Sequence, residues 1–172
     1  MSIKLEDYLP VVRHNGLNTD TAVALGSTLS VSGAVTLSGA LTPASIVEPN
    51  ETVTATETLT SADSGKTIFL NSATEFVTTL PSPAAGLKFR FVVKAAPSGA
   101  DYTVVTASSD NVIFGMVEVN GAAVAGVEED TITFADGAAA VGDWAEVVSD
   151  GTNWYVSGQG VAAGAITLTQ AS

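Results

Sequence analysis

Apolar and polar residues alternate with a period of two through much of this sequence, most regularly between Val23 and Pro43. The chain there reads VALGST, LSVSGA, VTLSGA and LTP, a six-residue repeat whose Ser-Gly-Ala steps supply bends between short strands. Three such repeats cannot bury their apolar side without a second layer. We therefore predict that residues 23–47 form a trimerisation segment, with an ordinary strand pair on the following domain as the alternative. The expected trimer core is Leu29, Val31, Val35, Leu37 and Leu41.

Residues 48–172 show a longer series of alternating segments separated by turns. The turns contain Asp-Gly, Asn-Gly, Ser-Gly or Pro-Ser pairs, which tolerate positive φ or preset turn dihedrals. No amphipathic helix of crossover length separates the segments, so we predict an all-β, antiparallel β-sandwich or jelly-roll-like domain. The expected strands are 52–59, 66–70, 76–80, 87–94, 102–106, 111–114, 116–119, 131–134, 144–149, 153–157 and 165–169.

The segment from Trp144 to Val156 is the clearest local prediction within this domain. Asp150-Gly151 favours a tight hairpin turn, and Trp144 and Trp154 lie on the two flanking strands. Large aromatic groups at such positions usually pack in a core or across strands. A surface pair of Trp residues that stacks on sugars is the alternative.

Residues 1–22 form a separate N-terminal arm with a different pattern. Sizeable apolar residues lie among polar ones, Pro10 limits any helix before it, and Asn15-Gly16 signals a turn. A frayed terminus is one interpretation. We favour an arm that docks on some other surface, because its apolar groups would be poorly placed in water. The expected contact residues are Ile3, Leu5, Tyr8 and Leu9.

Composition and charge narrow the setting of the protein. Val and Thr are abundant, which favours sheets over helices. The formal net charge is −12, and residues 95–172 carry ten acids without a single Lys or Arg. Such a surface repels nucleic acid and anionic lipid, so neither is an expected partner. The acids need have no role beyond solubility. No stretch is apolar enough to be a signal peptide or a membrane span, so synthesis in a cytoplasm is expected.

Residues that could carry chemistry are few, and we expect no enzyme activity, no cofactor and no metal site. The chain has no Cys, and its single His14 lies in the arm, away from any catalytic triad in the main domain. Glu128-Glu129-Asp130 lacks the ligand spacing of a calcium loop. Asp143 and Asp150 would have to converge across a cleft to act as a glycosidase pair. The Gly-rich stretch 121–126 lacks the Lys of a phosphate-binding loop.

Two parts of the sequence resemble virion proteins of tailed bacteriophages. The hexads LSVSGA and VTLSGA are similar to short repeats of phage fibres and fibrous head proteins, which wind chains into trimers. The second part is similar to a β-rich module of phage head decoration and fibre proteins. It comprises TLPSP at 79–83, GLKFRF at 86–91, NVIFG at 111–115, GDW at 142–144, SDG at 149–151 and WYVSG at 154–158.

This resemblance implies a structural virion protein on the capsid surface. We expect a homotrimeric decoration, or cement, protein that binds the major capsid protein and stabilises the head by adding interface between subunits. A tail-fibre or receptor-binding protein that grips host glycan is the first alternative. A polysaccharide depolymerase is a further alternative, although the sequence does not indicate a catalytic acid and base pair.

Overall fold

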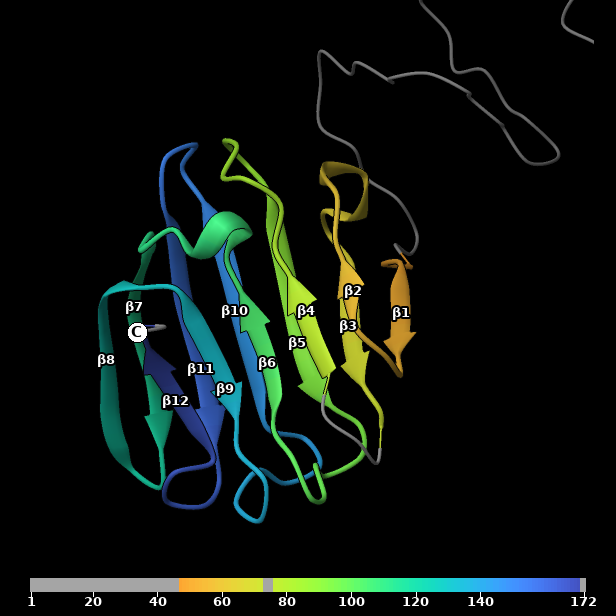
Figure 1. The fold of residues 1–172 in the computed structure, drawn as a ribbon, viewed down its shortest axis with the longest axis vertical. Coiled ribbons are helices and arrows are strands. Elements are labelled where there is room, and N and C mark those ends of the chain that lie inside the picture. The colour runs from red at the N-terminus through yellow and green to blue at the C-terminus, as the bar shows by residue number, and fades with distance from the viewer. Residues whose placement is uncertain (1–46, 73–75, 171–172) are drawn as a thin grey trace, which may run out of the picture. The chain divides into compact units, whose positions relative to one another are not determined.

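The computed structural model describes residues 47–72 and 76–170, which belong to one compact unit, Ser45–Ser172. These residues form two β-sheets packed face to face (Figure 1), with short 3-10 turns at Ser61–Asp63 and Ala107–Ser109 in place of longer helices. The all-β sandwich expected from the alternating pattern is confirmed.

The larger sheet has seven strands and the smaller has five. In spatial order, the larger sheet contains β1 (Asn50–Val53), β3 (Thr67–Leu70), β5 (Lys88–Val93), β10 (Trp144–Ser149), β11 (Trp154–Gly160), β7 (Ile113–Val119) and β8 (Ala122–Glu129). The smaller sheet contains β12 (Ile166–Thr169), β9 (Thr131–Phe134), β6 (Tyr102–Val105), β4 (Phe76–Thr79) and β2 (Glu57–Thr58). It lies nearer the viewer in Figure 1.

The first six strands wind alternately between the two sheets. The odd-numbered strands β1, β3 and β5 lie side by side in the larger sheet, and β2, β4 and β6 lie side by side in the smaller one. Each strand is therefore connected to its sheet neighbour through a strand of the opposite layer. Neighbours in both sets consequently run parallel, as do β7 and β11.

This winding corrects the expectation of a purely antiparallel sandwich. Parallel strands need a crossover connection, and a helix is the usual one. Here a strand of the facing sheet takes that place, so the absence of helices in the sequence does not exclude parallel pairing. The expected strand 52–59 is likewise divided into β1 and β2, which belong to different sheets.

Hairpins dominate the second half of the described chain. The β10–β11 hairpin turns at Asp150-Gly151 as the sequence predicts, with Gly151 at a φ of 105°. Strands β7 and β8 pair around Asn120-Gly121, where both residues have positive φ. Strand β8 was not predicted, because its small residues, AAVAGVEE, contain few of the bulky groups that mark a strand.

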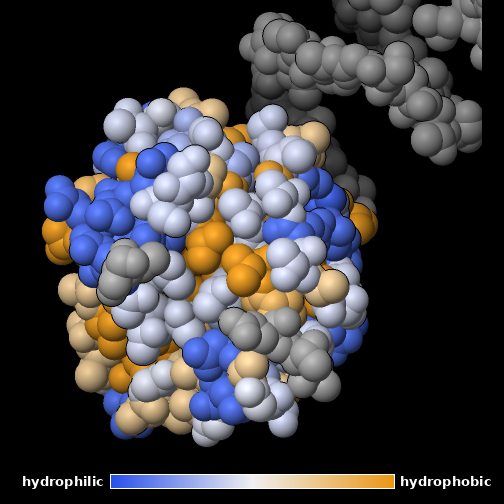
Figure 2. Space-filling view, in the orientation of Figure 1, coloured by the Kyte–Doolittle hydropathy of each residue, from blue (hydrophilic) through white to orange (hydrophobic). Residues whose placement is uncertain are grey.

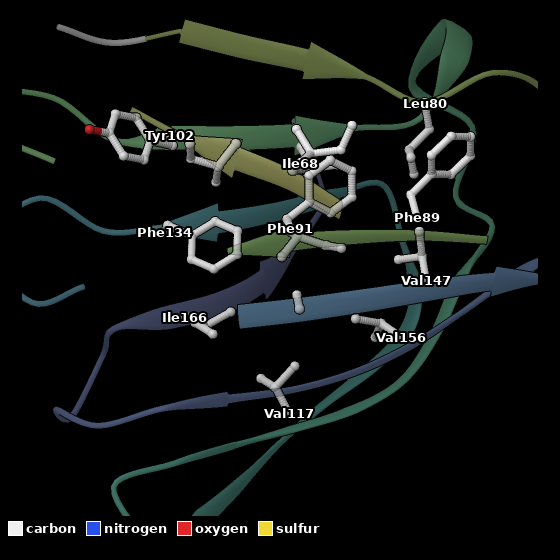
Figure 3. Packing of buried hydrophobic residues seen from close by; sticks show 14 of the residues in the cluster. Ile68, Leu80, Phe89, Phe91, Tyr102, Val117, Phe134, Val147, Val156 and Ile166 are labelled. Atoms are coloured by element: carbon white, nitrogen blue, oxygen red, sulfur yellow. The ribbon is translucent and has the colours of Figure 1, made fainter. Parts of the chain in front are cut away.

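The core fills the space between the two sheets with aliphatic and aromatic side chains. Phe89, Phe91 and Val147 of the larger sheet face Tyr102 and Phe134 of the smaller one (Figure 3), and all five are fully buried. On the β8 side, the smaller sheet approaches closely, because a Cβ on Gly126 would lie 2.8 Å from a methyl carbon of Leu168. Because side chains fill the space between the two sheets, we expect a functional site on their outer faces and loops.

Candidate functional site

The outer face of the larger sheet carries the main group of exposed apolar side chains. Because side chains alternate between the two faces of a strand, those next to buried residues of β3, β5, β10, β11 and β7 point to solvent. We define the aromatic face as the apolar residues among these outward positions: Phe69, Val92, Phe114, Met116, Trp144, Val148 and Tyr155. Met116, Tyr155 and Val148 are 54%, 45% and 40% exposed. An apolar group of this size on an open sheet is typical of an interaction surface.

The two Trp residues lie on opposite faces of the larger sheet. Trp154 is fully buried, with its ring 5.8 Å from that of Phe89. Trp144 is half-buried on the aromatic face, and the Arg90 guanidinium stacks 4.1 Å from the centre of its ring. Core packing is thus the role of Trp154, and the alternative of an exposed Trp pair is wrong.

A shallow depression of about 380 Å³ lies at the β1–β3–β5 side of the aromatic face. Phe69, Val92 and Val141 form much of its wall. Lys94 borders it, with Nζ 3.3 Å from the Thr52 hydroxyl and 6.0 Å from the centre of the Phe69 ring. Within the described residues, Lys94 forms no ion pair. The depression therefore offers an apolar wall beside an accessible cation.

The cations of the described chain all lie near this face. Lys88, Arg90 and Lys94 project outward from β5 and its end, while Lys66 precedes β3. Lys88 pairs with Glu146 at 3.0 Å. The aromatic face is thus the part of this acidic protein in which positive charge is concentrated.

Lys66 belongs to a local network at the entrance to β3. Its ammonium group lies 2.6 Å from Asp63 and 2.8 Å from Glu51, and these hydrogen bonds raise the pKa of Lys66. The Lys66 hydrogen bond, with further ones from the hydroxyl and amide of Thr60, lowers the pKa of Asp63 to about 2. Partial burial raises the pKa of Glu57, and the neighbouring Glu51 adds to this effect. The network fixes the turn before β3.

The outer face of the smaller sheet has a different character. Its outward positions are occupied by Thr or Val, without a charged residue: Thr58, Val77, Thr79, Thr103, Val105, Thr131, Thr133, Thr167 and Thr169. We call this set the threonine face. In Figure 2 the centre of the near face is pale and orange, and blue side chains gather around it. A partner could cover this centre without desolvating a charge.

The acidic residues considered for chemistry are used in local structure. Asp143 is 2% exposed and accepts hydrogen bonds from the amides of Ala140 and Val161. Asp150 accepts from the amides of Asn153 and Thr152 and from the Tyr155 hydroxyl, which together lower its pKa. The two carboxylates lie at opposite ends of β10, about 20 Å apart by strand length. That separation exceeds the reach of a glycosidase pair.

The three acidic residues 128–130 do not share one environment, because they differ in burial. Glu128 is exposed at the end of β8, whereas Asp130 is buried and accepts a hydrogen bond from the Thr131 hydroxyl. Over residues 47–72 and 76–170, no group of three or more His, Asp or Glu side chains is placed to hold a metal ion. In the same part of the chain, no helix has the length and apolar character needed to cross a membrane.

The predicted assembly residues fall in another part of the chain. The expected trimer core, Leu29, Val31, Val35, Leu37 and Leu41, and the expected shell contacts, Ile3, Leu5, Tyr8 and Leu9, lie outside the described residues. Sequence reasoning did not single out the aromatic face. The alternation in KFRFVVK at 88–94 is the signal that could have found it, because it separates two buried Phe from outward Lys and Arg.

In comparisons with known proteins, no protein-family model, curated protein or solved structure matches this chain.

Proposed function

We propose that this protein is a structural virion component: a trimeric decoration, or cement, protein that binds the outside of a bacteriophage head and stabilises the shell. The observation that carries the proposal is the uncharged threonine face, which a broad protein surface can cover without desolvating a charge. The exposed apolar side chains of the aromatic face are a second broad surface, which suits assembly with further protein. The hexad repeat and the resemblance to phage head proteins point to the same class of function.

The proposed mechanism is stabilisation by added interface. A decoration protein that binds only the closed shell shifts the equilibrium toward that shell by mass action. Each trimer would bridge neighbouring capsid subunits through residues 1–22, so opening the shell would require loss of those contacts. An interface of standard size, about 800 Å² per partner, is sufficient for specific attachment.

The direct test uses phage heads prepared without this protein. Addition of the purified full chain is expected to give saturable co-sedimentation with the heads and to raise the temperature at which they release DNA. Leu5→Asp combined with Leu9→Asp is expected to abolish both effects, while the matched change Asp136→Lys leaves them intact. Heads that neither bind the protein nor gain stability would refute the capsid assignment.

The trimer is tested separately by light scattering on the full chain. A mass divisible by three chains is expected, and Val35→Asp should reduce it because a charge would enter the shared core. A wild-type protein that remains monomeric at micromolar concentration would refute the trimer.

Host-glycan binding is a second candidate function, favoured by the depression beside Phe69 and Lys94. Aromatic walls with a few convergent polar groups are typical of small-ligand sites. A glycan array should then give a saturable signal that Phe69→Ala abolishes and Val161→Ala retains. The buried Trp154 is unsuitable for this test, because its removal would disturb the core.

A further inference from the structure

We propose that the aromatic face binds the aromatic face of a second copy of this chain. The contact would form around a two-fold axis that runs parallel to the strands, between β10 and β11. This inference goes beyond the trimer of the proposed function and uses different residues. Combined with that trimer, it would link neighbouring trimers in pairs.

The register of the sheet places the apolar residues at the centre of such a contact. Strands β5, β10, β11 and β7 are consecutive, so an axis between β10 and β11 exchanges β10 with β11 and β5 with β7. Val148 and Tyr155 are register partners on β10 and β11. The axis therefore places Val148 of one copy over the partner's Tyr155, and the reverse contact occurs by symmetry. Both side chains are exposed by 40% or more in the single chain.

The charges on the same face are complementary under the same operation. The cations Arg90 and Lys94 lie on β5 and at its end, whereas Glu118 lies on β7. Four outward residues form one row across the strands β5, β10, β11 and β7. Val92 pairs with Trp144, Trp144 with Gln159, and Gln159 with Glu118. Exchange of β5 with β7 places the partner's Glu118 opposite Val92, between Arg90 and Lys94, which lie two residues to either side. Opposite charges then meet twice in each pair.

The size and overall charge of the face also suit a second copy. The axis overlaps six strands, β3, β5 and β10 with β8, β7 and β11, and six strands about 4.8 Å apart and about 20 Å long give a surface on the order of 600 Å². This is close to the area that one partner buries in a standard interface. Outside this face the described residues carry far more acids than cations and would repel another copy. The outer face of the larger sheet, around the aromatic face, carries Lys88, Arg90 and Lys94 against Glu118 and Glu146, so two such faces can approach without that repulsion.

Charge reversal tests whether Lys94 and Glu118 pair between copies, because a purely structural effect of either substitution would not be reversed in the double variant. Lys94 and Glu118 lie on strands separated by β10 and β11, about 14 Å apart across the sheet, so they cannot pair within one chain. Lys94→Glu and Glu118→Lys are each expected to weaken self-association about tenfold or more, because like charges then meet. The double variant, Lys94→Glu with Glu118→Lys, should restore it. Asp136→Lys, an equal charge change in a loop outside the face, is the control for Glu118→Lys.

The readout is the mass of the full chain by sedimentation equilibrium over a range of concentrations, with circular dichroism to show that each variant is folded. Two or six chains in the wild type support the inference, and each single reversal should halve that mass. One or three chains up to the highest soluble concentration would overturn it, as would a double variant no tighter than the single ones. Two chains would also refute the trimer, and three would retain it, so the two proposals fail separately.

Discussion

Gly115, in the middle of β7, illustrates how one residue can determine whether a strand fits. Its φ is 125°, and a Cβ added there would lie 2.3 Å from the carbonyl oxygen of Val156 on the neighbouring strand. The contact is with backbone, so the strands themselves would have to separate. We expect Gly115→Ala to lower the free energy of unfolding by about 3 kcal/mol or more, measured by chemical denaturation.

The control for this prediction is Gly137→Ala. Gly137 also has a positive φ, 72°, but nothing lies within 4 Å of the added Cβ. Only backbone strain of about 1 kcal/mol is then expected. Equal losses at the two positions would contradict the close-approach argument.

Tyr102 is a second residue whose effect on stability can be assigned to one group, its hydroxyl. Its ring is fully buried beside Phe76, and its hydroxyl forms hydrogen bonds with the backbone of Ser72 and with the Ala95 carbonyl. Tyr102→Phe keeps the ring but removes these hydrogen bonds. We expect a loss of about 1–2 kcal/mol in thermal or chemical unfolding. An unchanged stability would show that the hydroxyl contributes nothing net.

At the scale of elements, the Thr60–Asp63–Lys66 network predicts a specific pH dependence. The folded-state pKa of Asp63 is lowered from 3.8 to about 2, so its stabilising effect is complete above about pH 4 and disappears as the pH falls through 2. Asp63→Asn should therefore be less stable than wild type at pH 7, by about 1 kcal/mol or less because the turn is largely solvated. The stability difference between the two proteins should vanish toward pH 2.

The elements also show what a local pattern can predict. Strands β9 and β10 have the bounds expected from alternation, and the β10–β11 hairpin turns where Asp150-Gly151 predicts. Alternation and turn chemistry are local properties, so the sequence reveals them directly. Strand β8 was missed because its stability comes from pairing with β7 and not from its own small side chains.

At the scale of the whole molecule, the two sheets share one core and are expected to unfold together. Trp154 is among the largest fully buried side chains, and Trp154→Ala should cost about 3–5 kcal/mol by leaving a cavity. The loss should appear as a lower midpoint of a single transition, seen alike by fluorescence and circular dichroism. Tyr155→Ala, an exposed neighbour on the same strand, should change stability far less. Separate transitions by the two probes would contradict a shared core.

The sequence by itself determined the class of fold, most strand positions and the main turns, because each depends on the two-residue period and on local dihedral preferences. Tertiary structure decided the winding of β1 to β6 between two sheets, since nothing in a short strand records which layer it joins. It also decided which Trp faces the core and which meets Arg90. The aromatic face was likewise settled only by folding, because residues far apart in the chain become neighbours through sheet register.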